Sequence, residues 1–131
     1  PVAVGGRLDL SVTVGPDVYT ATGSVPVPPV ITAVGGTFTR ADPIRVEWTA
    51  ATNPDRFTVS AFECWKSNPY TYTDTEVAGN RRSYAFPGEL PRDEYFLTVT
   101  SYGDGAFTGP VHPGSRMNIR GGRDFGVVGY C

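Results

Sequence analysis

The residues that could carry acid–base chemistry are few in this chain. Its single histidine, His112, stands between Val111 and Pro113 in a stretch rich in glycine and proline, with no pattern of cysteines or carboxylates beside it. A metal site or a proton relay needs such partners. No Gly-x-Ser-x-Gly sequence is present to hold a nucleophilic serine. We therefore interpret His112 as a solvated loop residue and expect no hydrolase.

The carboxylates favour catalysis no more than the histidine does. Asp93 and Glu94 are adjacent, and adjacent residues of a strand point to opposite faces, so the two cannot act on one substrate. Asp104 lies between two glycines, which is typical of a turn; a calcium site in a loop is the less favoured alternative. The sequence therefore predicts a protein that is not an enzyme and that uses no cofactor or metal.

Aromatic residues gather around the single lysine, Lys66. Trp65, Tyr70 and Tyr72 could stack on a sugar ring or on a protein partner. The favoured interpretation is that these residues cover a sheet, and a glycan or protein ligand is the alternative.

The two cysteines, Cys64 and Cys131, have no spacing that suits zinc or a redox motif. Two thiols in a chain rich in threonine, glycine and proline are most simply one disulfide, which predicts an oxidising compartment. Two unrelated free thiols are the alternative, and the sequence leaves open whether the bond forms within or between chains.

Composition limits the partners. The 131 residues suit one domain, and the net charge of −2 leaves no basic stripe for nucleic acid. The longest apolar runs fall far short of the ~20 residues of a membrane-spanning helix, so no transmembrane segment is expected. The start at Pro1 suits a processed or trimmed chain, and we expect a secreted or cell-surface protein of a bacterium.

The first 27 residues are expected to form a β-hairpin arm. Residues 7–14 alternate strictly, and residues 18–27 alternate again after a turn at residues 15–17. Prolines at 26, 28 and 29 mark the junction with the body, which spans residues 28–131. One face of the first strand carries four apolar side chains, which are Leu8, Leu10, Val12 and Val14.

The body is expected to be an all-β, two-sheet sandwich, because short strands alternate with turns and no segment offers a crossover helix. Trp48 is expected at the centre of the core, since it alternates with polar residues. The expected strands of the body are residues 31–34, 44–49, 56–65, 70–76, 83–86, 94–102 and 116–120.

Residues 28–119 resemble a fibronectin type III domain, which is an immunoglobulin-like β-sandwich. Residues 45–49 look like the second strand of that family with its core tryptophan, Trp48. Residues 88–99 are similar to the Leu-Pro turn that leads into a tyrosine corner, with Leu90 at the base of the core and Tyr95 at the corner.

The resemblance implies adhesion or scaffolding and no chemistry. It also implies that Cys64 and the tail that carries Cys131 leave the sandwich at the same end, so that a disulfide within the chain is reasonable, with the C-terminal tail bending back to it. The N-terminal arm and the disulfide are departures from the family.

The arm suggests the function. A two-stranded hairpin is marginal in water, so its apolar side chains need shelter, either on their own sandwich or on a neighbouring copy. Addition to a neighbour predicts self-association into a homopolymeric filament or surface assembly. The alternatives are a surface adhesion or carbohydrate-binding module, or a spacer domain of a surface lipoprotein.

Overall fold

The structure is a computed structural model that describes residues 3–36, 41–63, 72–87, 95–109 and 117–128. Within these ranges every regular element is a β-strand, which confirms the expected all-β fold. None of the described segments is a helix long and apolar enough to cross a membrane. The strands are β1 (Arg7–Val14), β2 (Asp17–Ser24), β3 (Val30–Gly35), β4 (Arg45–Thr49), β5 (Arg56–Glu63), β6 (Tyr72–Ala78), β7 (Ser83–Ala85), β8 (Tyr95–Asp104), β9 (Ala106–Thr108) and β10 (Asn118–Val128).

Two sheets form the sandwich. One sheet has the order β10-β8-β5-β6 and the other has the order β3-β4-β7, with antiparallel pairing throughout. Strictly alternating side chains of β4, β5 and β8 meet between the sheets, as their sequence pattern predicts. The ring of Trp48 packs edge-on against Phe57, with centroids 5.4 Å apart. The buried core consists of Ile44, Val46, Trp48, Phe57, Val59, Ala61, Phe86, Tyr95, Leu97 and Val99.

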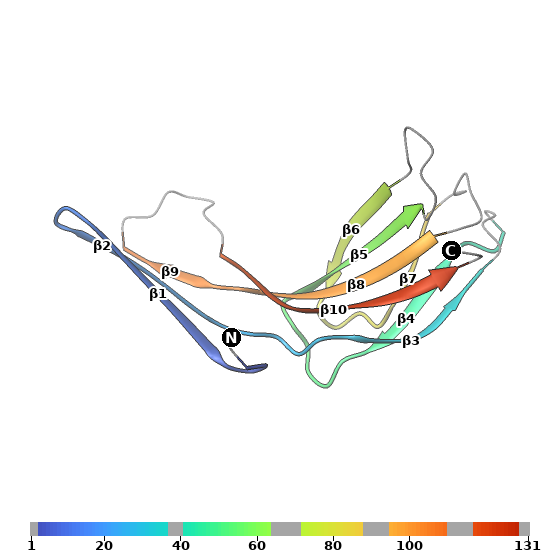
Figure 1. Cartoon of the computed structure of the whole chain (residues 1–131), viewed down its shortest axis with the longest axis horizontal. Helices are drawn as coiled ribbons and strands as arrows, with labels where there is room; N and C mark the ends of the chain where they lie inside the picture. The colour runs from blue at the N-terminus through green and yellow to red at the C-terminus, as the bar shows by residue number, and fades with distance from the viewer. Residues whose placement is uncertain (1–2, 37–40, 64–71, 88–94, 110–116, 129–131) are drawn as a thin grey trace.

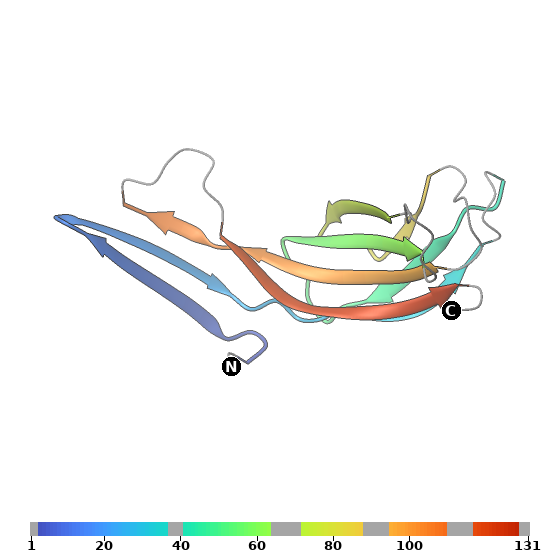
Figure 2. The ribbon, with the colours of Figure 1, turned by 45° about the horizontal axis from the view of Figure 1, so that its top comes forward.

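A third sheet forms an arm that projects from one end of the sandwich (Figure 1). Its first two strands, β1 and β2, are the hairpin that the sequence predicts; Gly15 takes a positive φ of 59° in the two-residue turn between them. Its third strand, β9, continues the line of β8 beyond Gly105 and pairs with β2 (Figure 2). The arm is therefore anchored to its own chain.

The last strand is longer than expected. The sequence predicts a short strand over residues 116–120, whereas β10 runs from Asn118 to Val128 and pairs with β8 almost throughout. Gly121 and Gly122 lie just past the expected end of the strand, where the register shifts at a β-bulge, and the strand continues beyond them. A side chain at Gly121 would overlap the carbonyl oxygen of Pro26 and lie 2.5 Å from the Ser101 hydroxyl. The glycine therefore lets the linker between β2 and β3, residues 25–29, approach β10 instead of ending the strand.

Candidate self-association surface

The arm presents apolar side chains to solvent. The sequence leaves open whether the alternating side chains of β1 are sheltered by their own sandwich or by a neighbouring copy; in the structure of the single chain Leu10 is 52% exposed, Val12 47% and Val14 60%. Pairing with β9 joins the arm to the body through its backbone, but no described element lies over this face of β1. The arm thus carries exposed apolar surface that a larger contact would remove from water.

The apolar face is hollowed at its centre. Leu10 of β1 pairs across the sheet with Ala21 of β2, which pairs in turn with Phe107 of β9. Ala21, which is 2% exposed between these two longer side chains, helps to line an open hollow of about 230 Å³ on this face. It is lined by Leu10, Val12, Tyr19, Thr20, Ala21 and Phe107.

The opposite face of the arm is polar. Arg7 and Asp9 form an exposed ion pair at 2.9 Å, and the hydroxyl groups of Thr20 and Thr108 share a hydrogen bond between β2 and β9. Ser11 and Thr13 lie on this side of β1 by strand alternation. The arm is consequently an amphipathic sheet with one polar face and one apolar face.

The outer edge of the arm is open. Among the described residues β1 pairs with β2 on one side and with no strand on the other. A two-residue hairpin turn is flanked by a hydrogen-bonded pair, here Val14 and Asp17, so alternate residues such as Ser11 and Thr13 direct their backbone groups to the free edge. Natural proteins block such edges with charge or proline. The stretch from Leu10 to Val14 has neither.

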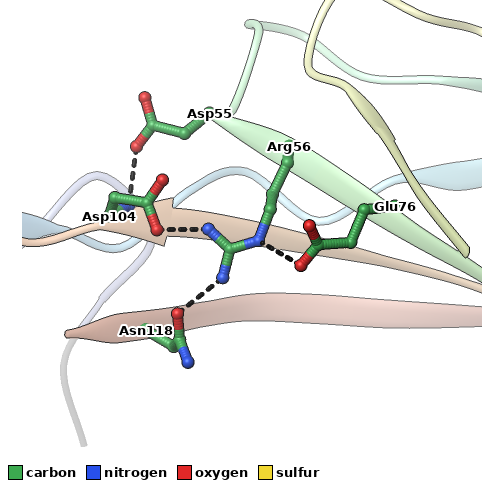
Figure 3. A network of polar contacts seen from close by, with 5 residues as sticks. All are labelled: Asp55, Arg56, Glu76, Asp104 and Asn118. Carbon is green, nitrogen blue, oxygen red and sulfur yellow. Dashed lines mark hydrogen bonds and ion pairs between the residues drawn. The ribbon is translucent and has the colours of Figure 1, made fainter. Parts of the chain in front are cut away.

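A polar network holds the arm at the point where it leaves the sandwich (Figure 3). The side chain of Arg56 on β5 is 11% exposed, and it contacts Glu76 on β6 at 3.2 Å, Asn118 on β10 at 2.6 Å and Asp104 on β8. The carboxylate of Asp55 accepts a hydrogen bond of 2.7 Å from the backbone of Asp104. Four strands are thereby joined where β8 passes into β9, which fixes the direction of the arm. Nothing in the sequence pattern around Arg56 marks this role.

Replacing Arg56 with methionine, which keeps the length of the side chain, is expected to lower the free energy of unfolding by about 1–2 kcal/mol. The loss is modest because Glu76 is 60% exposed and Asp104 46%, so water takes over their hydrogen bonds. Urea denaturation measures it. The matched control is Arg7→Met, whose ion pair with Asp9 is in solvent and whose loss should change stability by less than about 0.5 kcal/mol. Equal effects of the two substitutions would contradict the role of the network.

A second exposed apolar patch lies on the sandwich. Phe125 and Val127 of β10 stand beside Thr98 and Phe96 of β8 in the sheet register, so Phe96, Phe125 and Val127 share the outer face of the four-stranded sheet. All three side chains are exposed. The end of β10 that carries Phe125 and Val127 lies at the opposite end of the molecule from the arm (Figure 1).

The other sequence-predicted site residues divide into two groups. Trp48 and Tyr95 are buried in the core, and Leu8 lies half-buried on the apolar side of β1. The remaining ones lie outside the described residues: Leu90, both cysteines (Cys64 and Cys131), and the aromatic residues Trp65 and Tyr70, together with the side chain of Tyr72, whose backbone begins β6. The disulfide and the aromatic patch accordingly stay predictions.

The described residues gather no group of three or more histidine, cysteine, aspartate or glutamate side chains that would hold a metal ion. His112, Asp93 and Glu94 lie outside these residues. Comparison of the chain with protein-family models, with curated proteins and with solved structures finds no significant match. The arm, with its open edge and its apolar face, is therefore the feature on which a function can be argued.

Proposed function

We propose that this chain is a non-enzymatic, extracellular structural protein, a subunit of a homopolymeric filament or surface assembly in which β1 of one copy adds to a neighbouring copy. The observation that carries the proposal is an eight-residue edge strand, from Arg7 to Val14, that has a partner on one side and exposed apolar side chains along its length. Strand addition supplies main-chain hydrogen bonds to such an edge.

The charges of β1 favour an antiparallel arrangement. Parallel, in-register addition of a second β1 would place Arg7 beside Arg7 and Asp9 beside Asp9, and like charges directly opposite are destabilising. Antiparallel addition about Ser11 places Asp9 beside Thr13 and Leu10 beside Val12. It pairs polar with polar and apolar with apolar side chains on each face of the joined sheet. Because both copies use the same edge, this contact joins them as a pair, and a different contact must link the pairs into a filament.

We also propose that the body is a domain of the fibronectin type III kind. Immunoglobulin-like sandwiches place their first, second and fifth strands in one sheet and their third, sixth and seventh in the other. Of the strands in the body, β3, β4 and β7 share one sheet, and β5, β8 and β10 share the second, with β6 beside β5. The buried Trp48 and Tyr95 support the same assignment. Such a domain offers a rigid scaffold for the arm, which suits an extracellular assembly at a bacterial surface.

The test is to block the open edge without changing the faces of the arm. Ser11→Pro removes one backbone donor that we place on the free edge, whereas Ser11→Ala removes the same hydroxyl and keeps the donor. The wild-type chain and the Ser11→Ala control are expected to form filaments in negative stain. Ser11→Pro should need at least about tenfold more protein than the Ser11→Ala control to assemble by half in sedimentation velocity.

Circular dichroism and thermal unfolding of Ser11→Pro establish that the sandwich is still folded. A wild-type chain that sediments as a monomer at every concentration would overturn the proposal. So would a folded Ser11→Pro chain that forms filaments as readily as the Ser11→Ala control.

A further inference from the structure

The hollow on the arm has the size and lining of a site for an aromatic ring. An engineered apolar cavity of about 150 Å³ in another protein takes up benzene. The hollow over Ala21 measures about 230 Å³ and is open to solvent, so its volume is sufficient for a phenyl ring. None of its lining residues is charged.

The chain itself carries a suitable ring. Phe125 is 61% exposed, more than any other large apolar side chain among the described residues. Val127 and Phe96 stand beside it on the same outer face of β8 and β10, and none of the three is charged. Burial of this patch would remove three apolar side chains from water together with those of the arm.

The ring and the hollow of one molecule cannot meet. The end of β10 lies at one end of the long axis, the arm lies at the other, and the sandwich separates them (Figure 1). The Arg56 network joins β5, β6, β8 and β10 at the start of the arm, and these contacts oppose folding of the arm back over the sandwich. A second copy of the chain must therefore supply the ring.

We propose that Phe125 of one copy, flanked by Val127 and Phe96, docks in the hollow over Ala21 on the arm of the next copy. The two surfaces differ and lie at opposite ends, so the contact is heterologous and repeats without closing, which generates an open chain of subunits. It goes beyond the edge contact of β1, uses none of the edge hydrogen bonds and stands if the edge contact fails. In a filament that uses both contacts, the Phe125 contact joins successive subunits end to end, and the β1 contact joins neighbouring subunits side by side.

The test uses the Ser11→Pro chain, in which the edge contact is removed. Phe125→Ala removes the ring, and Ala21→Leu fills the hollow from its base. Each added substitution is expected to weaken the remaining self-association, measured by sedimentation equilibrium, by about tenfold to a hundredfold. The matched control is Val18→Ala, a similarly exposed apolar residue on the polar face of the arm, which should leave the association unchanged.

Mixing the two variants decides the geometry. The Phe125→Ala chain keeps its hollow and the Ala21→Leu chain keeps its ring, so an equimolar mixture should form a 1:1 dimer and no longer species, while each variant alone stays monomeric. Far-ultraviolet circular dichroism and thermal unfolding show that both variants are folded. A mixture of folded variants that remains monomeric overturns the proposal.

Other occupants of the hollow give other results. Loss of association in Ala21→Leu but not in Phe125→Ala would assign the hollow to a different group and overturn the role of Phe125. A monomeric parent chain that binds the apolar dye 1-anilinonaphthalene-8-sulfonate, with binding lost in Ala21→Leu, would overturn it in favour of a small apolar ligand. An otherwise wild-type Ser11→Pro chain that assembles as readily as the Ser11→Ala control would contradict the edge contact alone, so the two proposals fail separately.

Discussion

Replacing Trp48 by alanine is expected to lower the free energy of unfolding by about 3–5 kcal/mol. The side chain is 2% exposed in the centre of the sandwich, where its ring packs on Phe57 between the two sheets. Truncation removes the largest buried side chain of the core and leaves a cavity that a sheet-on-sheet interface closes poorly, since both sheets are held by their own hydrogen bonds. Urea or thermal unfolding of the Trp48→Ala chain measures the loss.

The matched control is Trp48→Phe. It keeps an aromatic ring against Phe57, and it also removes the indole N–H, which is buried with no hydrogen-bond partner among the described residues. The smaller ring leaves a cavity, which destabilises the chain, whereas removal of an unsatisfied buried donor stabilises it. We therefore expect the free energy of unfolding to change by less than about 1.5 kcal/mol. A Trp48→Phe chain as unstable as Trp48→Ala would show that the N–H has a partner, and a mild Trp48→Ala would show that the core does not depend on this ring.

Local alternation was sufficient to predict most of the sandwich. The residues that β4 directs inward, Val46 and Trp48, are buried, and the same holds for Phe57 and Val59 of β5. Period-2 patterning with one buried face is a property of each strand alone, and so is the turn chemistry of the β1–β2 hairpin at Gly15. These features need no information from the rest of the chain.

The missed features depend on contacts between distant segments. Strand β9 has three residues, and its pairing with β2 joins Phe107 to Ala21, 86 positions earlier in the chain. The hollow forms only because Leu10, Ala21 and Phe107 lie side by side across three strands. Arg56 likewise gains its role from Asp104 and Asn118, which lie far along the sequence. Such a row or network leaves no periodic signal in any one segment.

The exposure of the arm is the most informative difference between expectation and structure. A hairpin with one apolar face was expected to be covered. Pairing with β9 satisfies backbone groups of β2 but leaves Leu10, Val12 and Val14 in contact with water. A single chain therefore pairs both sides of β2, but among the described residues it leaves the outer edge of β1 without a partner strand and the apolar face of the arm in water. The open edge is the physical basis of the proposed β1 contact, and the apolar face is the basis of the proposed Phe125 contact.

Gly121→Ala is expected to destabilise the junction between body and arm by about 3 kcal/mol, at the upper end of the cost of overpacking. The new methyl group would overlap the carbonyl oxygen of Pro26 and lie 2.5 Å from the hydroxyl of Ser101, which belong to the linker and to β8. Because one of the two atoms is backbone, a rotamer change cannot relieve the overlap, and the linker must move away from β10. Hydrogen–deuterium exchange should report the movement as faster exchange at Val25 and in β2, with smaller changes in β5.

Gly35→Ala is the matched control for this prediction, because a methyl group at Gly35 would meet no atom within 4 Å and its backbone needs no positive φ. It should change the free energy of unfolding by less than about 0.5 kcal/mol. If the linker holds the arm in the orientation that both proposed contacts need, Gly121→Ala should also raise the protein concentration required for assembly, while Gly35→Ala leaves it unchanged. A Gly121→Ala chain that is as stable as the Gly35→Ala chain would show that the linker does not pack on β10.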